Sequence, residues 1–197
     1  MFTGIIEQMG SVEETTDTEI GRRLVLSGDD LGGLPLGASI SVNGVCLTAI
    51  ATGDDSVTVE VVPETLQRTN LGNLVRESQV NLERPMLANG RFDGHIVQGH
   101  VDGTGTVTAL DRSDDGAVVM TIVVPASLQR YLVEKGSITI DGVSLTIADI
   151  VDDHFSVALI PHTLQVTTLG LRIPGDTVNL EVDVLAKYVE RLLKGTE

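Results

Sequence analysis

The chain of 197 residues has no tryptophan and only two tyrosines and three phenylalanines. Its core must therefore be built from Val, Leu and Ile. Cys46 is the only cysteine, which excludes an internal disulfide and fits a reducing cytosol. The sequence shows no basic start and no long apolar run, so we expect neither a signal peptide nor a membrane span. These absences predict a small cytoplasmic protein with an aliphatic core.

Basic residues are also scarce, because 13 Lys and Arg stand against 28 Asp and Glu, giving a net charge of −15. Neutralising phosphates requires clustered Lys and Arg, so nucleic acid and anionic membranes are excluded as expected partners. The acidic residues are scattered and form no tail, which indicates solubility. The histidines make no convincing metal set and no second cysteine supports zinc, so no metal is expected. They are His95, His100, His154 and His162.

What the sequence does contain is an internal repeat. Residues 39–48 return as residues 137–146, an offset of 98, and residues 63–72 and 80–83 return at the same offset as 161–170 and 178–181. Solenoid repeats run to roughly 20–50 residues, whereas this period has the size of a small domain. The repeat predicts two copies of one domain, so that a site in one copy has a counterpart in the other.

Each copy reads as mainly β structure. Short segments rich in Val, Ile and Thr are separated by Gly, Asp and Asn turns, as in a small barrel or sandwich. The predicted strands are 23–26, 39–50, 56–62 and 80–83 in the first copy, and 117–124, 137–151, 155–160 and 178–182 in the second. Each copy also has a Pro-x-Thr-Leu block, whose end at Leu-Gly predicts a short helical turn capped by glycine.

The segments outside the repeat predict a linker and a helix. Residues 85–94 contain Pro, Asn and Gly and are interpreted as the linker, so the second copy begins near His95. After the second copy, apolar residues at 185, 188, 189, 192 and 193 follow helical spacing. A helix this short is marginal alone in water. It must pack either on its own barrel or against the tails of other subunits.

Three blocks in each copy could meet around a small ligand. They are the Gly-led segment, expected to be the first strand of each copy (residues 4–7, matched by 99–102 at an offset of 95), the Gly-Val-(Cys/Ser)-Leu-Thr strand and the Pro-x-Thr turn. Glycine allows close approach to the backbone, and the nearby hydroxyls add donors and acceptors for a planar heterocycle. These hydroxyls belong to Thr48, Thr65, Thr146 and Thr163.

The two copies differ at positions that bear on chemistry. His100 stands where the first copy has Ile5, Ser144 where it has Cys46, Asp141 where it has Asn43, and His162 where it has Glu64. Such differences would let each copy treat its own ligand differently. Histidine suits acid–base work, whereas a lone cysteine in an apolar strand is more often a small buried hydrophobe than a nucleophile.

Two other motif classes are excluded by context. Gly99, Gly103 and Gly105 precede more strand and no helix, which argues against a dinucleotide-binding loop. No Gly-x-Ser-x-Gly elbow supports a serine hydrolase. From the residues alone, the prediction is a duplicated barrel that binds a small ligand.

A set of motifs runs through both copies in order: residues 1–7, 43–48, 64–72, 94–102, 141–146 and 181–188. With these motifs the sequence resembles the riboflavin synthase family, the lumazine-dismutating alpha-chain type. The resemblance implies an all-β fold of tandem duplicated six-stranded Greek-key barrels with a short C-terminal α-helix. The corresponding domains are 1–90 and 95–184, each a lumazine-binding barrel, and 185–197, an oligomerisation helix and tail.

The resemblance also implies a function. The family takes two molecules of 6,7-dimethyl-8-ribityllumazine and transfers a four-carbon unit between them. The products are riboflavin, in the last step of its biosynthesis, and 5-amino-6-ribitylaminouracil, and no metal or cofactor takes part. The implied assembly is a homotrimer, with each active site between the N-terminal barrel of one subunit and the C-terminal barrel of its neighbour. No motif indicates an association with lumazine synthase.

The resemblance assigns residues position by position. Implied ligand contacts in the first copy are Gly4, Ile5, Ile6, Cys46, Leu47, Thr48, Glu60, Val61, Val62, Pro63, Glu64 and Thr65. In the second copy they are Gly99, His100, Val101, Lys135, Ser144, Leu145, Thr146, Ala158, Leu159, Ile160, Pro161, His162 and Thr163. The residues expected to act in catalysis are Phe2, Ser39, Cys46, His100, Ser144, Thr146 and Asp183.

A chemical hypothesis accompanies this assignment. The methyl group at C7 of the lumazine is acidic because its carbanion delocalises into the ring, and His100 with the Thr146 hydroxyl is the expected base. Water near Cys46 and Thr48 is expected to add to the acceptor molecule. Holding the two rings face to face in opposite directions supplies most of the acceleration, an orientation effect of about 7–11 kcal/mol.

Three alternatives remain at this stage. A lumazine carrier would keep the duplicated barrel and bind one ligand, but one copy's motifs should then be eroded, and both are intact. A flavin reductase would need an Arg-x-Tyr-(Ser/Thr) signature and a nucleotide-binding domain, and residues 130–132 do not fit. A purely structural homotrimer would not explain why the glycine and threonine blocks match between the two copies.

Overall fold

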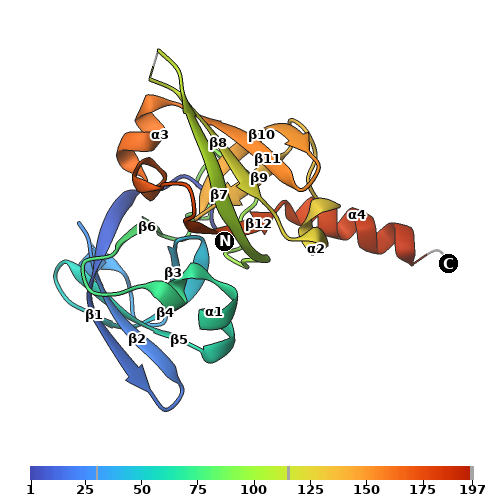
Figure 1. The fold of residues 1–197 in the computed structure, drawn as a ribbon. Coiled ribbons are helices and arrows are strands. Elements are labelled where there is room, and N and C mark those ends of the chain that lie inside the picture. Colours follow the sequence, from blue (N-terminus) through green and yellow to red (C-terminus); the bar gives the residue numbers. More distant parts are fainter. Residues whose placement is uncertain (30, 115, 196–197) are drawn as a thin grey trace.

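The computed structural model describes residues 1–29, 31–114 and 116–195. Two closed six-stranded barrels lie one against the other, and a C-terminal helix extends away from the second barrel (Figure 1). All strand pairings are antiparallel across the described ladders. The predicted fold class, tandem six-stranded barrels with a C-terminal helix, is confirmed.

The first barrel, called the N-barrel, closes in the strand order β1-β2-β5-β4-β3-β6. Its strands are β1 (Gln8–Thr18), β2 (Gly21–Ser27), β3 (Ser39–Val42), β4 (Val45–Thr52), β5 (Ser56–Val61) and β6 (Gln79–Glu83). Its helical turns are η1 (Leu31–Gly33), α1 (Pro63–Arg68) and η2 (Asn70–Asn73).

The second barrel, called the C-barrel, closes as β10-β11-β8-β7-β12-β9. Its strands are β7 (Gly103–Arg112), β8 (Val118–Val123), β9 (Ser137–Ile140), β10 (Val143–Val151), β11 (His154–Leu159) and β12 (Thr177–Val182). Its helical elements are α2 (Ala126–Gln129), α3 (Pro161–Val166) and η3 (Thr168–Leu171), and α4 (Val184–Lys194) follows the barrel. The two strand orders correspond element by element.

Two sequence predictions about strands were wrong. Residues 39–50 and 137–151 each form a hairpin, because Asn43-Gly44 and Asp141-Gly142 turn the chain with positive φ at both positions (46° and 78°, 47° and 81°). Such pairs favour the two-residue turn that matches the strand twist. The Gly-led segments were expected to be first strands, yet β1 and β7 begin after them, at Gln8 and Gly103.

Alternation along the strands builds both cores. In β5, for example, Val57, Val59 and Val61 are buried while the residues between them are half-buried. Each barrel encloses its own aliphatic cluster, and Phe155 is the only aromatic residue among the buried members of either cluster. Side chains that alternate with the core therefore point to the outer face of each barrel.

The Pro-x-Thr blocks form helices, but not with the predicted glycine cap. Helix α1 ends at Arg68, and Thr69 then caps the separate turn η2 by accepting a hydrogen bond from the Leu71 amide. Gly72 lies inside that turn, where an added Cβ would meet the Leu66 carbonyl oxygen at 2.4 Å. The glycine is thus required for close approach of two backbones rather than for ending a helix.

A buried polar network joins the two barrels. Asn70 Nδ2 donates to Asp141 Oδ1 (2.8 Å), Asn81 Nδ2 donates to the Asp141 carbonyl, and Asn179 Nδ2 donates to the Asn43 carbonyl. The hairpin turns meet nearby, since a Cβ on Gly44 would lie 2.7 Å from the Gly142 nitrogen. Because these contacts relate equivalent positions of the two copies, the barrels pack about an approximate two-fold axis.

Helix α4 leaves much of its apolar side exposed. Leu185, Tyr188, Val189, Leu192 and Leu193 are each more than half exposed. A groove of about 540 Å³ runs between the helix and the C-barrel. None of the helices in the described residues is long and apolar enough to cross a membrane.

Candidate active site

The outer face of β4 carries the first cluster of predicted ligand contacts. Val45, Leu47 and Ala49 point into the N-barrel, so Cys46 and Thr48 point outward. A cavity of about 260 Å³ lies over this face, and its lining comes from β4, β5 and the start of α1. The lining residues are Cys46, Leu47, Thr48, Ile50, Glu60, Val62 and Thr65, all predicted except Ile50. This cluster is called the first half-site.

The same strands of the C-barrel carry the second half-site, with each position shifted by 98 residues. It consists of Ser144 and Thr146 on β10, Ala158 on β11, Ile160, and Thr163 on α3. One difference concerns charge: Glu60, which is ion-paired with Arg23 at 2.9 Å, is replaced by Ala158. The second half-site therefore has the same backbone frame with a less charged wall.

The Gly-led segments cross over between the barrels, contrary to the prediction. Gly4 was expected to lie with Cys46 and Gly99 with Ser144. Instead the Ser144 amide donates to the Gly4 carbonyl (2.7 Å), and the Cys46 amide donates to the Gly99 carbonyl (2.9 Å). Ile6 packs on the C-barrel core and Val101 on the N-barrel core. Each half-site thus combines a strand of one copy with the Gly-led segment of the other.

Only glycine fits at these crossing points. Gly4 and Gly99 both have φ of +77°, and an added Cβ would lie 2.6 Å from the Cβ of Ser144 or Cys46 respectively. Left-handed conformation and lack of space act together here.

Two buried carboxylates fix the crossing segments. Glu83 accepts from the Thr3 amide (2.6 Å) and the Gly4 amide (3.0 Å). Glu181 accepts in the same way from the Gly99 and His100 amides (2.9 and 3.0 Å). Burial raises the pKa of both carboxyl groups, and the backbone donors partly oppose that shift. The predicted residue set omitted both glutamates, although the repeated Val-Asn-Leu-Glu block pairs them in the sequence.

The residues expected to act in catalysis are distributed over three places. Cys46 and the segment bearing His100 belong to the first half-site, and Ser144 and Thr146 belong to the second. Ser39 lies on β3 opposite Thr48. The expected pairing of His100 with Thr146 therefore joins opposite half-sites.

Phe2 and Asp183 both make structural contacts, and their expected roles in catalysis stay predictions. The Phe2 side chain is 0% exposed, and its backbone pairs with Val97 where the two Gly-led segments meet. A ring so enclosed cannot touch a ligand here, and its place indicates that it positions both segments. The Asp183 carboxylate accepts from the Leu185 amide and so caps α4.

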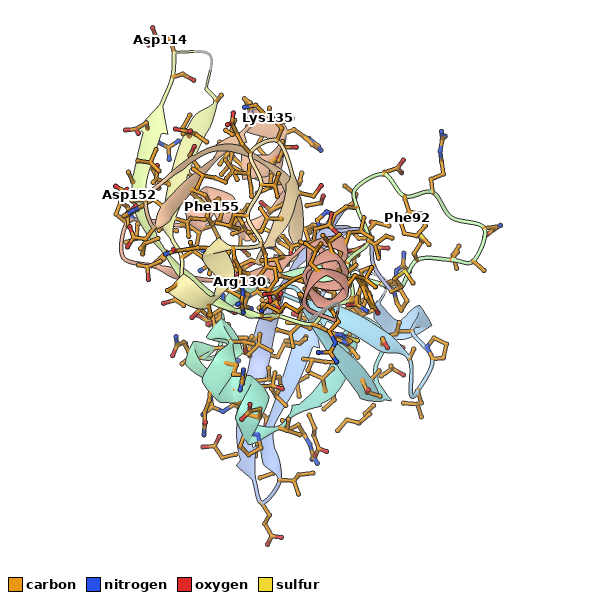
Figure 2. The ribbon with its side chains drawn as sticks, turned by 90° about the vertical axis from the view of Figure 1, so that its right-hand side faces the viewer. Phe92, Asp114, Arg130, Lys135, Asp152 and Phe155 are labelled. Carbon is orange, nitrogen blue, oxygen red and sulfur yellow. The ribbon has the colours of Figure 1, made fainter. Side chains whose placement is uncertain are left out.

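Lys135 lies at one end of the C-barrel (Figure 2), and its backbone amide donates to the Ile147 carbonyl of β10 (2.9 Å). It adopts φ of +63°, where the first copy has Gly37 at +80°. Its ammonium donates to the Ala148 carbonyl (2.7 Å), two residues from Thr146. The left-handed conformation of a lysine carries backbone strain that glycine at the equivalent position avoids.

His95 is a further residue that the sequence assignment left out. Its Nδ1 lies 2.8 Å from Ser144 Oγ, at the edge of the second half-site. It follows the loop that carries Phe92, which projects away from both barrels in Figure 2. Across residues 1–29, 31–114 and 116–195, no three His, Cys, Asp or Glu side chains are grouped to hold a metal ion.

The two barrels match a known domain family. The lumazine-binding domain family matches residues 3–85 and 98–183, one match for each barrel. Riboflavin synthase of Mycobacterium tuberculosis is 50% identical over 202 residues, covering 98% of this chain and 98% of that protein.

This chain belongs to the riboflavin synthase family. The riboflavin synthases of Actinobacillus pleuropneumoniae and Bacillus subtilis are 46% and 44% identical, and each match covers 98% of this chain and 90% of the relative.

Solved structures extend the likeness from sequence to shape. LumP complexed with riboflavin superposes with a TM-score of 0.85 at 25% identity, covering 92% of this chain and 99% of that one. LumP complexed with 6,7-dimethyl-8-(1'-D-ribityl) lumazine gives a TM-score of 0.83 at 24% identity, a likeness of fold alone.

Proposed function

We propose that the protein catalyses the riboflavin synthase reaction, a transferase step in riboflavin biosynthesis. Two molecules of 6,7-dimethyl-8-ribityllumazine react, one giving a four-carbon unit to the other. The products are riboflavin and 5-amino-6-ribitylaminouracil. Their atoms together equal those of the two lumazines, so the reaction needs no oxidant and no further group donor. Membership of the riboflavin synthase family across almost the whole chain supports this proposal.

The observation that carries the proposal is the pair of equivalent but chemically different half-sites. A reaction between two identical molecules requires that one act as donor and the other as acceptor. The two half-sites share a backbone frame, yet Cys46 faces one ligand and Ser144 the other, with Glu60 replaced by Ala158. Like ligands bound in unlike surroundings can take different parts in one reaction.

The residues beside each ligand have separate tasks in this proposal. His100 and the Thr146 hydroxyl act as the base that removes a proton from the C7 methyl group of one lumazine. Water held near Cys46 and Thr48 adds to the other. His100 lies with the first half-site and Thr146 with the second. Both can therefore act on the same two ligands only where a first half-site faces a second half-site.

That requirement supports an active site between subunits. The cavity of the first half-site is lined by N-barrel residues alone among those described, and it opens to the outside. In a homotrimer, the first half-site of one subunit would face the second half-site of its neighbour. The exposed apolar side chains of α4 offer the contact that such an assembly needs. Sedimentation equilibrium should give three times the chain mass, and a monomer would contradict this part of the proposal.

A carrier function is the second candidate, because the LumP structures share the fold and hold riboflavin or a lumazine. Two observations favour the enzyme. The three riboflavin synthases compared above are 44% to 50% identical, against 25% for LumP, and both half-sites keep their glycine and threonine positions.

The deciding experiment adds purified protein to 6,7-dimethyl-8-ribityllumazine alone and follows riboflavin by its visible absorbance. One riboflavin should form for every two lumazines consumed, with or without a chelator. Tight lumazine binding without product would favour the carrier, and neither binding nor product would contradict both functions. A cytoplasmic location is a separate proposal, which cell fractionation tests.

A further inference from the structure

His95 forms a contact that distinguishes the second half-site from the first. Its Nδ1 lies 2.8 Å from Ser144 Oγ, and its backbone amide donates to the Thr3 carbonyl (3.2 Å). Gly94 brings the chain close enough for this, since an added Cβ there would lie 2.1 Å from the Thr3 oxygen and 3.0 Å from Ser144 Oγ. The backbone at residues 94 and 95 is therefore held against Thr3 and close to Ser144, which places the imidazole beside the Ser144 hydroxyl.

Burial of the His95 side chain favours its uncharged form. Burial lowers the pKa of His95, and the Asp183 carboxylate opposes that shift only in part. A neutral imidazole has one nitrogen that accepts and one that donates. When Nδ1 is the acceptor, the Ser144 hydroxyl donates to it, and the lone pairs of Oγ remain free toward solvent and ligand.

The first half-site has a different arrangement. Among the described residues that line its cavity there is no histidine. His100 is carried on the crossing segment next to Cys46, and its own side chain is exposed. Among the described residues, only in the second half-site is an imidazole hydrogen-bonded to the side chain at the equivalent of Cys46.

We propose that His95 is a positioning residue, which fixes the Ser144 hydroxyl as a hydrogen-bond acceptor for the ligand in the second half-site. The donor on the ligand would be an N–H of the pyrimidinedione ring or a ribityl O–H. This inference rests on the proposed function. It adds to that function a difference between the half-sites, which bind the same molecule through side chains of different polarity. The second half-site accepts a hydrogen bond where the first offers a thiol.

The test compares four variants by kcat and KM for riboflavin formation and by riboflavin affinity from fluorescence titration. His95→Ala and Ser144→Ala should each lower kcat/KM about tenfold, the equivalent of one hydrogen bond. The double variant should lose no more than the worse single variant, because both remove the same contact. His95→Asn should recover most of the loss, since its amide oxygen reaches the place of Nδ1. His154→Asn, an exposed histidine paired with Asp153, is the matched control and should leave kcat/KM unchanged.

A measurement on the unaltered protein keeps the test independent of folding defects in the variants. In that protein, nitrogen-15 NMR should show His95 with its proton on Nε2 and with Nδ1 unprotonated. A comparison spectrum of Ser144→Ala should show a shifted Nδ1 resonance. A proton on Nδ1, unchanged kinetics in His95→Ala, or multiplying losses in the double variant would overturn the inference. Failure of the proposed function would appear separately, as absence of riboflavin formation by the unaltered protein.

Discussion

The N-barrel and the C-barrel have the same strand order and hairpin turns at the same positions, yet they differ at several positions where a side chain points away from the core. At the junction, Asn43 and Leu74 of the first copy correspond to Asp141 and Arg172 of the second. Interior positions need only volume and apolar character, whereas outward positions determine contacts with ligand and neighbour. Duplication thus kept the frame and left the outer faces free to become different.

The largest effect is expected from breaking the ion pair that only the second copy has. Asp141 is fully buried, and it accepts from two nitrogens of Arg172 at 3.1 and 2.7 Å. Asp141→Asn removes the counter-ion and should lower the free energy of unfolding by about 3 kcal/mol, the lower end for breaking a buried pair, because Arg172 is partly exposed. Urea unfolding measures this.

The control restores the first copy's pairing. Asp141→Asn combined with Arg172→Leu reproduces Asn43 and Leu74, and it should recover more than half of the loss. Arg172→Leu alone leaves a buried carboxylate whose pKa, already raised by burial, rises further. A raised folded-state pKa gives stability at low pH that is lost as pH rises through it. This variant should therefore gain stability on acidification, and a flat pH profile would contradict the account.

The second prediction tests the crossing of the Gly-led segments. Gly99→Ala places a Cβ 2.6 Å from that of Cys46, at φ of +77°. We expect a loss of about 2–4 kcal/mol from backbone strain and overpacking, together with weaker ligand binding in the first half-site. Gly4→Ala should do the same to the second half-site.

Gly37→Ala is the matched control for this prediction. Its φ is +80°, but nothing lies within 4 Å of an added Cβ. The strain alone should cost about 1 kcal/mol. Equal losses at Gly37 and Gly99 in chemical unfolding would show that the close approach to Cys46 contributes nothing.

The third prediction exchanges a residue between the copies with little effect on stability. Lys135→Gly gives the second copy the glycine that the first has at position 37. Relief of backbone strain should offset the lost contact with Ala148. The free energy of unfolding should therefore change by less than about 1 kcal/mol. The KM for the lumazine should rise several-fold if the ammonium serves the second half-site. Unchanged kinetics in steady-state assays would remove Lys135 from the set of ligand contacts.

The parts of the fold that follow local rules could be predicted, while the parts that depend on how the copies pack could not. The repeat predicted two copies of one domain, and the Val-, Ile- and Thr-rich segments between turns predicted a barrel or sandwich in each. The family resemblance added the six strands, and the spacing from Leu185 to Leu193 predicted α4. The crossing of the Gly-led segments has no local signal, because Gly4 matches Gly99 in either arrangement. The Asn43-Gly44 turn, by contrast, was visible in the sequence and was missed within a continuous apolar run.

The candidate site divides in the same way. Cys46 and Thr48 were assigned as ligand contacts from the repeated block and the family resemblance, and the cavity includes both. Glu83 and His95 act through contacts with Thr3 and Ser144, which are 80 and 49 residues away in sequence. Contacts of this range arise only once both barrels have formed, so spacing along the chain cannot reveal them.

The smallest expected effect concerns α4, an element that the N-barrel lacks. Glu190 accepts from Tyr131 Oη (2.5 Å) and from Lys194 Nζ (2.6 Å), and Arg130 lies 3.2 Å away. Hydrogen bonds from Lys194 and then Tyr131 lower the pKa of this carboxyl group. A lowered folded-state pKa gives stability that is present above the ordinary glutamate range and lost as pH falls through the folded value. The docking of α4 should therefore loosen only in acid.

Amide exchange of residues 185–193, corrected for intrinsic rates, should show protection falling below about pH 4. In Glu190→Gln, protection should be lower throughout and lose this acid step, and a persistent step would assign the titration to another group.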